Sequence, residues 1–149
     1  MRQVEVPFVV YWGDADPAEL IFYPNVFRYV MQAEYALFRG LGYTLRTMRE
    51  LGIVNPRVHV EADYRKPLWV HDRGVCRLWV SRIGRSSLRL DFALVKEGEE
   101  EPAVTGHLVQ VFVDAQTMRP VAIPEELRQA LAEGDSDGGR DGPDEKRAE

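Results

Sequence analysis

One stretch constrains the fold of this chain more than any other: residues 25–41, where apolar side chains recur at helical spacing on most of the circumference. One apolar stripe consists of Phe22, Val26, Val30, Ala33, Leu37 and Leu41, and a second consists of Phe27, Met31 and Phe38. A helix that is apolar on most sides is mostly buried. Pro24 suits the helix start, because proline lacks the N–H that would be unpaired there. The stretch therefore predicts one long, mostly buried helix.

Alternating apolar and polar residues predict strands around this helix. The predicted strands are residues 3–10, 58–64, 75–83, 87–97 and 103–114, and two short helices are predicted at residues 44–51 and 124–132. The last three strands follow one another at hairpin spacing, which indicates antiparallel pairing. Pro7 donates no hydrogen bond to a neighbouring strand, which places the first strand at an edge or a bulge. These patterns predict an α+β domain with about five antiparallel strands wrapped round one long central helix.

The domain is expected to span residues 1–132. Residues 133–149 contain Gly, Asp, Glu and Arg but no apolar anchor, so we expect a disordered polar tail there. A single sheet round one helix leaves a strand edge and some apolar surface uncovered. Pairing of subunits into a homo-oligomer would cover both.

Composition excludes several classes of protein. The formal net charge of -5 provides no broad basic field for nucleic acid. No apolar run approaches the roughly 18 residues of a transmembrane helix, and residues 1–10 lack the features of a signal peptide. Cys76 is the only cysteine, so no internal disulfide is possible. We expect a cytoplasmic protein with no nucleic-acid or membrane partner.

Two carboxylates, Asp14 and Asp16, stand in the turn before the long helix. In one interpretation Asp16 caps a helical turn, with Pro17 first and Glu19 third. In a second, Asp-x-Asp is a phosphotransferase motif with Mg²⁺, but the chain lacks the further acidic ligands and the strand–helix alternation of such enzymes. In a third, a carboxylate acts as nucleophile or general base beside backbone N–H groups from Tyr23 onward, which would stabilise an oxyanion. The residues alone leave the first and third open.

Other ionisable residues give weaker signals. Glu34 falls on the second apolar stripe, where a buried ion pair is favoured over a part in the active site. His59, His71 and His107 are not spaced as metal ligands and no cysteine lies near them, so no metal site is predicted.

The turn and the helix start also resemble a known family. We find a resemblance to the signature of the 4-hydroxybenzoyl-CoA thioesterase family of hotdog-fold enzymes in Gly13-Asp14-Ala15-Asp16-Pro17-Ala18 and Ile21-Phe22-Tyr23-Pro24-Asn25. Residues 63–68 with Asp72, residues 83–87 and residues 119–124 are also similar to parts of that family. The resemblance runs from about residue 5 to residue 127.

This resemblance implies a hotdog fold, assembled as a dimer or as a dimer of dimers (a homotetramer), that hydrolyses acyl-CoA thioesters. It implies that Asp16 is the catalytic carboxylate, as nucleophile or general base, and that the backbone N–H of Tyr23 is the oxyanion donor. It favours Arg85 and Arg119 as ligands of the CoA phosphates, since guanidinium groups bind phosphate well. No cofactor is implied, because CoA is part of the substrate. Glu19 stands where the family usually has Gly, and a side chain there would narrow the acyl pocket or alter the turn.

Two other functions on the same fold deserve comparison. A hotdog dehydratase typically uses a histidine at the head of the helix, and no histidine occurs between Met1 and Arg57. A non-catalytic acyl-CoA-binding domain is the main alternative, although the intact Asp16 and Pro24-Asn25 argue against it.

The Tyr-Pro-Asn form of the motif suggests an aromatic acyl group such as 4-hydroxybenzoyl, with aliphatic groups left open.

Overall fold

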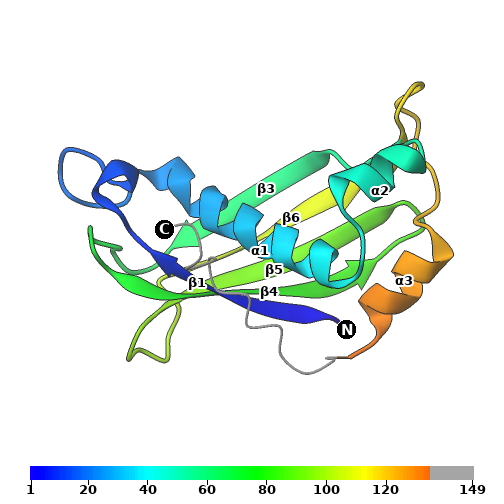
Figure 1. The fold of residues 1–149 in the computed structure, drawn as a ribbon. Coiled ribbons are helices and arrows are strands. Elements are labelled where there is room, and N and C mark those ends of the chain that lie inside the picture. Colours follow the sequence, from blue (N-terminus) through cyan, green and yellow to red (C-terminus); the bar gives the residue numbers. More distant parts are fainter. Residues whose placement is uncertain (135–149) are drawn as a thin grey trace, which may run out of the picture.

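A computed structural model of the protein describes residues 1–134, in which a five-stranded antiparallel sheet carries one long helix on one face (Figure 1). In spatial order, the strands of this sheet are β1 (Gln3–Val9), β4 (Arg73–Ile83), β5 (Ser87–Lys96), β6 (Val104–Val111) and β3 (Arg57–Tyr64). The long helix is α1 (Val26–Gly40). The smaller elements are η1 (Trp12–Asp14), η2 (Tyr23–Asn25), α2 (Leu45–Glu50), β2 (Ile53–Val54), β7 (Val113–Asp114) and α3 (Glu125–Ala132).

The structure confirms the predicted five-stranded antiparallel sheet and the long helix. Strands β4, β5 and β6 pair in succession as hairpins, and β1 lies at an edge, as Pro7 indicated. Strand β3 crosses over to pair with β6 and forms the other edge. The pair formed by β2 and β7 was not predicted, because two-residue strands carry no periodic signal. Of the predicted tail, residues 135–149 lie outside the described part of the chain.

Helix α1 packs against the inner face of the sheet through its first apolar stripe. Val26, Val30 and Ala33 are fully buried there. The opposite side of the helix is open in the single chain, with Met31 and Tyr35 each 57% exposed. The predicted wrapping of the sheet round the helix is therefore seen on one side of the helix only.

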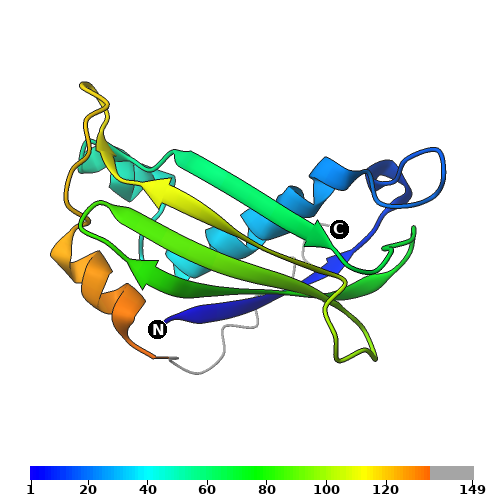
Figure 2. The same ribbon diagram turned by 180° about the vertical axis from the view of Figure 1, so that it is seen from behind.

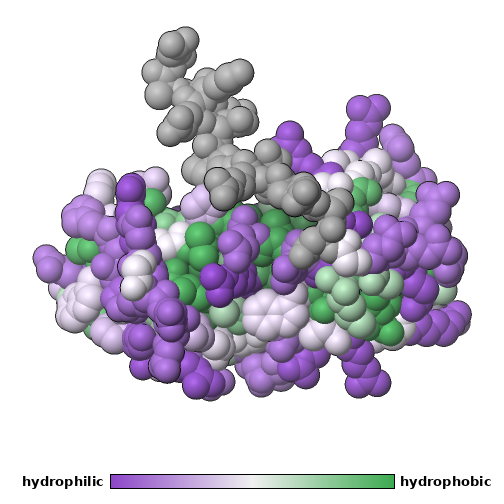
Figure 3. All heavy atoms as spheres, turned by 90° about the horizontal axis from the view of Figure 1, so that it is seen from below, coloured by the Kyte–Doolittle hydropathy of each residue, from purple (hydrophilic) through white to green (hydrophobic). Residues whose placement is uncertain are grey.

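The outer face of the sheet bears no helix from the described residues, as Figure 2 shows by placing the strands in front of α1. Viewed from below, the molecule presents hydrophilic residues that flank smaller hydrophobic patches (Figure 3). None of the helices within residues 1–134 is long and apolar enough to cross a membrane.

Candidate active site

Asp16 lies in a tight turn that folds the segment before α1 back on itself. The turn is closed by a bridge between Ala15 and Ile21 and by a hydrogen bond of 2.7 Å from the Asp16 N–H to the Leu20 carbonyl. The Asp16 Oδ1 atom accepts hydrogen bonds from the N–H groups of Ala18 at 2.8 Å and Leu20 at 3.3 Å. One carboxylate oxygen thus holds the turn in shape. No hydrogen bond to the other oxygen, Oδ2, is formed by any described residue.

The same turn contains a strained residue. Glu19 has a φ of 67°, a left-handed conformation that glycine adopts readily and other residues adopt at a cost. Its carbonyl accepts a hydrogen bond from the Val70 N–H at 2.9 Å, which ties the turn to the segment before β4. The turn therefore keeps a conformation suited to Gly although the side chain is Glu. The side chain is exposed, which leaves the turn room for it.

Asp14 joins this turn to the helix. Its carboxylate is buried and accepts hydrogen bonds from the Tyr29 hydroxyl and the Arg28 Nη1 atom, both at 3.1 Å. Its carbonyl accepts hydrogen bonds from the Phe22 N–H and the Asn25 side-chain amide, both at 2.9 Å. Burial, together with the Asp14 charge, raises the pKa of Tyr29 well above its usual range. Because all these contacts stay within the turn and α1, Asp14 serves to position the turn.

Tyr23 begins η2, which runs directly into α1. Its carbonyl accepts a hydrogen bond from the Tyr64 hydroxyl of β3. Its N–H donates no hydrogen bond to any residue among 1–134, as is usual for the first N–H of a helix. The start of the helix is thus fixed in place and keeps an N–H that can bind a negatively charged or polarised oxygen.

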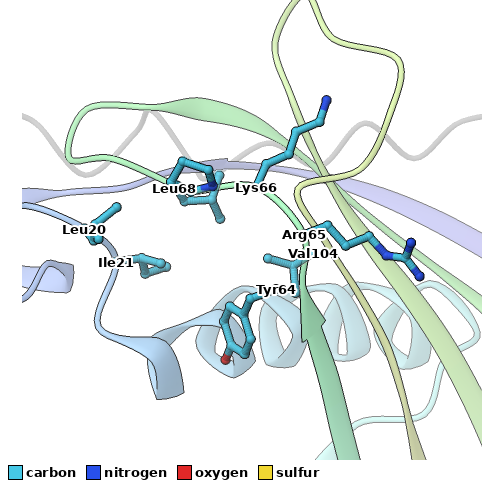
Figure 4. Close-up of a pocket in the computed structure, with 8 residues that line it drawn as sticks. Leu20, Ile21, Tyr64, Arg65, Lys66, Leu68 and Val104 are labelled. Carbon is cyan, nitrogen blue, oxygen red and sulfur yellow. The ribbon is translucent and has the colours of Figure 1, made fainter.

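A pocket of about 320 Å³ lies between the Asp16 turn and the ends of β3 and β6 (Figure 4). Its floor is apolar and includes Ile21, Tyr64 and Val104. The side chains of Arg65 and Lys66 stand at the rim and extend outward. The pocket therefore combines an apolar interior with cationic groups at its mouth.

Glu34 of α1 is buried, as predicted, and its partners come from two strands. Its Oε2 atom accepts hydrogen bonds from Arg57 Nε at 3.0 Å and from Gln110 Nε2 at 2.6 Å. Asn55 in turn donates to Gln110 Oε1 at 2.9 Å. Burial raises the pKa of Glu34, while Arg57 and Gln110 act in the opposite direction. The helical pattern identified Glu34 but no feature of the sequence identified Arg57 or Gln110 as its partners.

Glu34 also lines a groove with a volume of about 570 Å³. The groove runs along the open side of α1 toward α2, and Met31 and Tyr35 line it. The groove is mostly apolar, and Glu34 with Arg57 supplies a polar group at its wall.

Arg85 and Arg119 lie far along the sheet from Asp16. Arg85 follows the end of β4, and Arg119 follows β7, at the end of the molecule where α3 packs (Figure 1). Neither guanidinium forms an ion pair or hydrogen bond with a residue in the range 1–134. Arg89, by contrast, is paired with Asp91 at 2.9 Å. Within one chain the predicted phosphate ligands and the predicted catalytic carboxylate are therefore not brought together.

Comparisons with known proteins show which family the chain resembles. The family model of the thioesterase-like superfamily matches residues 10–131. The 1,4-dihydroxy-2-naphthoyl-CoA hydrolase of Synechococcus elongatus is 28% identical over 133 residues, which are 88% of this chain and 96% of that protein.

Solved structures show the same fold. The PA5185 protein of Pseudomonas aeruginosa superposes with a TM-score of 0.78 at 30% identity, over 87% of this chain and 89% of that one. Slr0204 of Synechocystis, a 1,4-dihydroxy-2-naphthoyl-CoA thioesterase, has a TM-score of 0.81 at 15% identity, over 87% and 96%. These likenesses support the predicted hotdog type of fold but do not single out 4-hydroxybenzoyl-CoA. Since the family model covers nearly all of the folded part, the chain belongs to the thioesterase-like superfamily.

Proposed function

We propose that this protein hydrolyses the thioester of an acyl-CoA to the free acid and CoA. The observation that carries the proposal is the arrangement at the head of α1. The turn presents one oxygen of the Asp16 carboxylate and the Tyr23 N–H at the start of the helix, and neither has a hydrogen-bond partner among residues 1–134. The membership of the superfamily supports the same activity.

The chemistry needs two groups. A thioester carbonyl is already a good electrophile, so attack requires a positioned base or nucleophile and stabilisation of one developing negative charge. Asp16 supplies the first group, either by attacking the carbonyl or by activating a water molecule. The Tyr23 N–H, assisted by the helix dipole, supplies the second. No cofactor takes part in this proposal.

The acyl group that the site would favour is aromatic. The pocket and the groove beside α1 are both mainly apolar and contain tyrosine or phenylalanine side chains. The similar cyanobacterial protein is named as a hydrolase of 1,4-dihydroxy-2-naphthoyl-CoA, whose acyl group is a hydroxylated aromatic ring. We propose a hydroxylated aromatic acyl-CoA, of which 4-hydroxybenzoyl-CoA is one example.

A second copy of the chain would complete the site. Strand β3 is an edge strand, and Val58 and Val60 on it are 61% and 49% exposed. Unpaired, partly apolar edges favour pairing with another chain. In an antiparallel pair of β3 strands, the Tyr64 end of one, near Tyr23, would lie beside the Arg57 end of the other. We therefore propose a homodimer, or a dimer of dimers, in which the pocket of one subunit meets the Glu34 groove of the next.

This assembly would also account for the distant arginines. In one chain, Asp16 follows β1, which ends beside the start of β4, whereas Arg85 follows the other end of β4 and Arg119 follows β7. Antiparallel pairing brings opposite ends of two subunits toward each other, so Arg85 and Arg119 of the partner subunit would lie on the side of the Asp16 turn. Their guanidinium groups, which have no partner among the described residues, suit the CoA phosphates.

A panel of acyl-CoA thioesters with a thiol-detecting dye tests the activity. We expect thiol release that is fastest with hydroxylated aromatic acyl groups and that persists in EDTA. A non-catalytic acyl-CoA-binding domain would bind members of the panel without releasing thiol. Binding without release across the whole panel would therefore overturn the proposal in favour of that alternative.

A further inference from the structure

Three potential metal ligands meet on the outer face of the sheet, where β3 and β6 pair. The His107 Nδ1 atom lies 2.8 Å from Glu61 Oε1, and the His59 Nε2 atom lies 3.2 Å from Glu61 Oε2. One atom from each of the three residues lies within 4.8 Å of the other two. The two imidazole rings stack with centroids 5.2 Å apart. One carboxylate is therefore shared between two imidazoles on neighbouring strands.

The sheet register creates this cluster. Glu61 of β3 stands directly opposite His107 of β6. His59 lies two residues before Glu61, so its side chain is on the same face of the strand. Spacing along the sequence gave no sign that His59 and His107 lie close together, because their proximity depends on the pairing of β3 with β6.

We propose that His59, Glu61 and His107 bind one Zn²⁺ ion. Two imidazole nitrogens and one carboxylate oxygen are a donor set that zinc accepts, with the fourth tetrahedral position left to water. Because the ligands come from two strands, the ion would join the edge strand β3 to β6. Binding needs each coordinating nitrogen in its lone-pair form, so the ring proton moves to the other nitrogen of each imidazole.

The surroundings tolerate a cation. On β5, Asp91 stands opposite His107 in the register. Asp91 accepts hydrogen bonds from Arg89 Nε at 2.9 Å and from the Ser81 hydroxyl at 2.6 Å. The positive charge of Arg89 is thus largely offset by Asp91. Glu61, which is itself a proposed ligand, supplies a negative charge directly at the ion.

The proposed ion lies on the opposite side of the sheet from the thioester site. Side chains alternate between faces along a strand, so Val60 and Leu108 point toward α1 while His59, Glu61 and His107 point outward. Zinc at this position would stabilise the edge strand and take no part in hydrolysis. The two proposals therefore stand or fall separately.

Metal titration of the tag-free, chelator-treated full chain tests the inference. We expect one Zn²⁺ per chain by isothermal titration calorimetry, and a visible absorption band of tetrahedral Co²⁺ when that ion is used as a probe. Zn²⁺ should raise the melting temperature, because it binds the folded state. Mg²⁺ should not, because it prefers oxygen ligands.

Variants locate the site. His59→Ala and Glu61→Gln are on the exposed edge strand and should each weaken Zn²⁺ binding at least about tenfold, in line with losses seen when even outer groups of a metal site are removed. His71→Ala is the matched control, since His71 is the remaining histidine and lies in the turn before β4. Absence of a Zn²⁺ titration in the wild type would overturn the proposal. Equal affinity in the wild type, His59→Ala and Glu61→Gln would also overturn it.

Discussion

The Tyr29 hydroxyl donates a hydrogen bond to the buried Asp14 carboxylate at 3.1 Å. This contact joins the second turn of α1 to the loop that carries Asp16. The Val70 N–H ties the turn at Asp16 to the segment before β4, whereas the Tyr29–Asp14 contact helps to set where that turn lies relative to the helix start.

Tyr29→Phe removes this contact and keeps the ring in the core. We expect the free energy of unfolding to fall by about 1–2 kcal/mol, because a buried carboxylate loses one of its donors. We also expect kcat to fall, since the Asp16 turn is less firmly placed. Tyr35→Phe, on the exposed side of the same helix, is the control for stability and should leave the free energy of unfolding unchanged. Chemical denaturation and thiol-release kinetics measure both effects, and unchanged stability in Tyr29→Phe would contradict this role.

The left-handed conformation of Glu19 predicts opposite outcomes for two substitutions. Glu19→Gly relieves the strained φ and should leave the free energy of unfolding unchanged or raise it by up to about 1 kcal/mol. Glu19→Val introduces a β-branched side chain that fits this conformation poorly. This substitution should lower the free energy of unfolding by more than about 1 kcal/mol. Urea denaturation of both variants provides the comparison. If Glu19→Val matched the wild type, the turn would have a different conformation in solution.

The raised pKa of Glu34 predicts a pH-dependent stability. Burial is the main cause, and the ordinary value of the group is 4.5. As the pH rises above 4.5, the unfolded chain releases this proton while the folded protein still holds it. Until the pH reaches the pKa of Glu34 in the folded protein, each rise in pH therefore lowers the contribution of this group to the free energy of unfolding. Glu34→Gln removes that loss. From pH 4.5 up to the folded pKa, the melting temperature of the variant relative to that of the wild type should therefore increase, and above that pH it should level off. A difference in melting temperature that does not change with pH would contradict the raised pKa of Glu34.

The exposed edge of β3 predicts that one charge will disrupt the assembly. Val58→Lys places a lysine on the edge strand, a substitution that natural edges use to prevent pairing. We expect the variant to shift from a homo-oligomer to a monomer in light scattering coupled to size-exclusion chromatography. Gln116→Lys adds the same charge in the turn after β7 and should leave the assembly intact. A wild-type protein that is already monomeric would exclude the proposed pairing.

Local patterns in the sequence were enough to predict the main elements. Apolar spacing predicted a helix at 25–41, and α1 occupies Val26–Gly40. Pro7 indicated an edge, and β1 forms one. These features depend on residues close together in the chain, which is why periodicity and proline chemistry could identify them.

Features that depend on strand order and register could not be read in the same way. The partnership of Glu34 with Arg57 requires β3 to cross over to the edge beside β6 and under α1. The meeting of Glu61 with His107 requires one particular register of those strands. Arg85 lies far from Asp16 because Arg85 follows one end of the long strand β4 and the Asp16 turn lies near the other end.

The rate of thiol release by Asp16→Asn decides whether Asp16 is the catalytic carboxylate. Asparagine keeps a side-chain oxygen that can accept the hydrogen bonds from Ala18 and Leu20, so the turn should persist. We expect a loss of at least about a hundredfold in kcat with the best acyl-CoA of the panel, and we expect calorimetry to show that CoA binding is largely retained. Asp63→Asn, an exposed change of the same kind on β3, should hydrolyse at the wild-type rate. Near-wild-type turnover by Asp16→Asn would contradict the account.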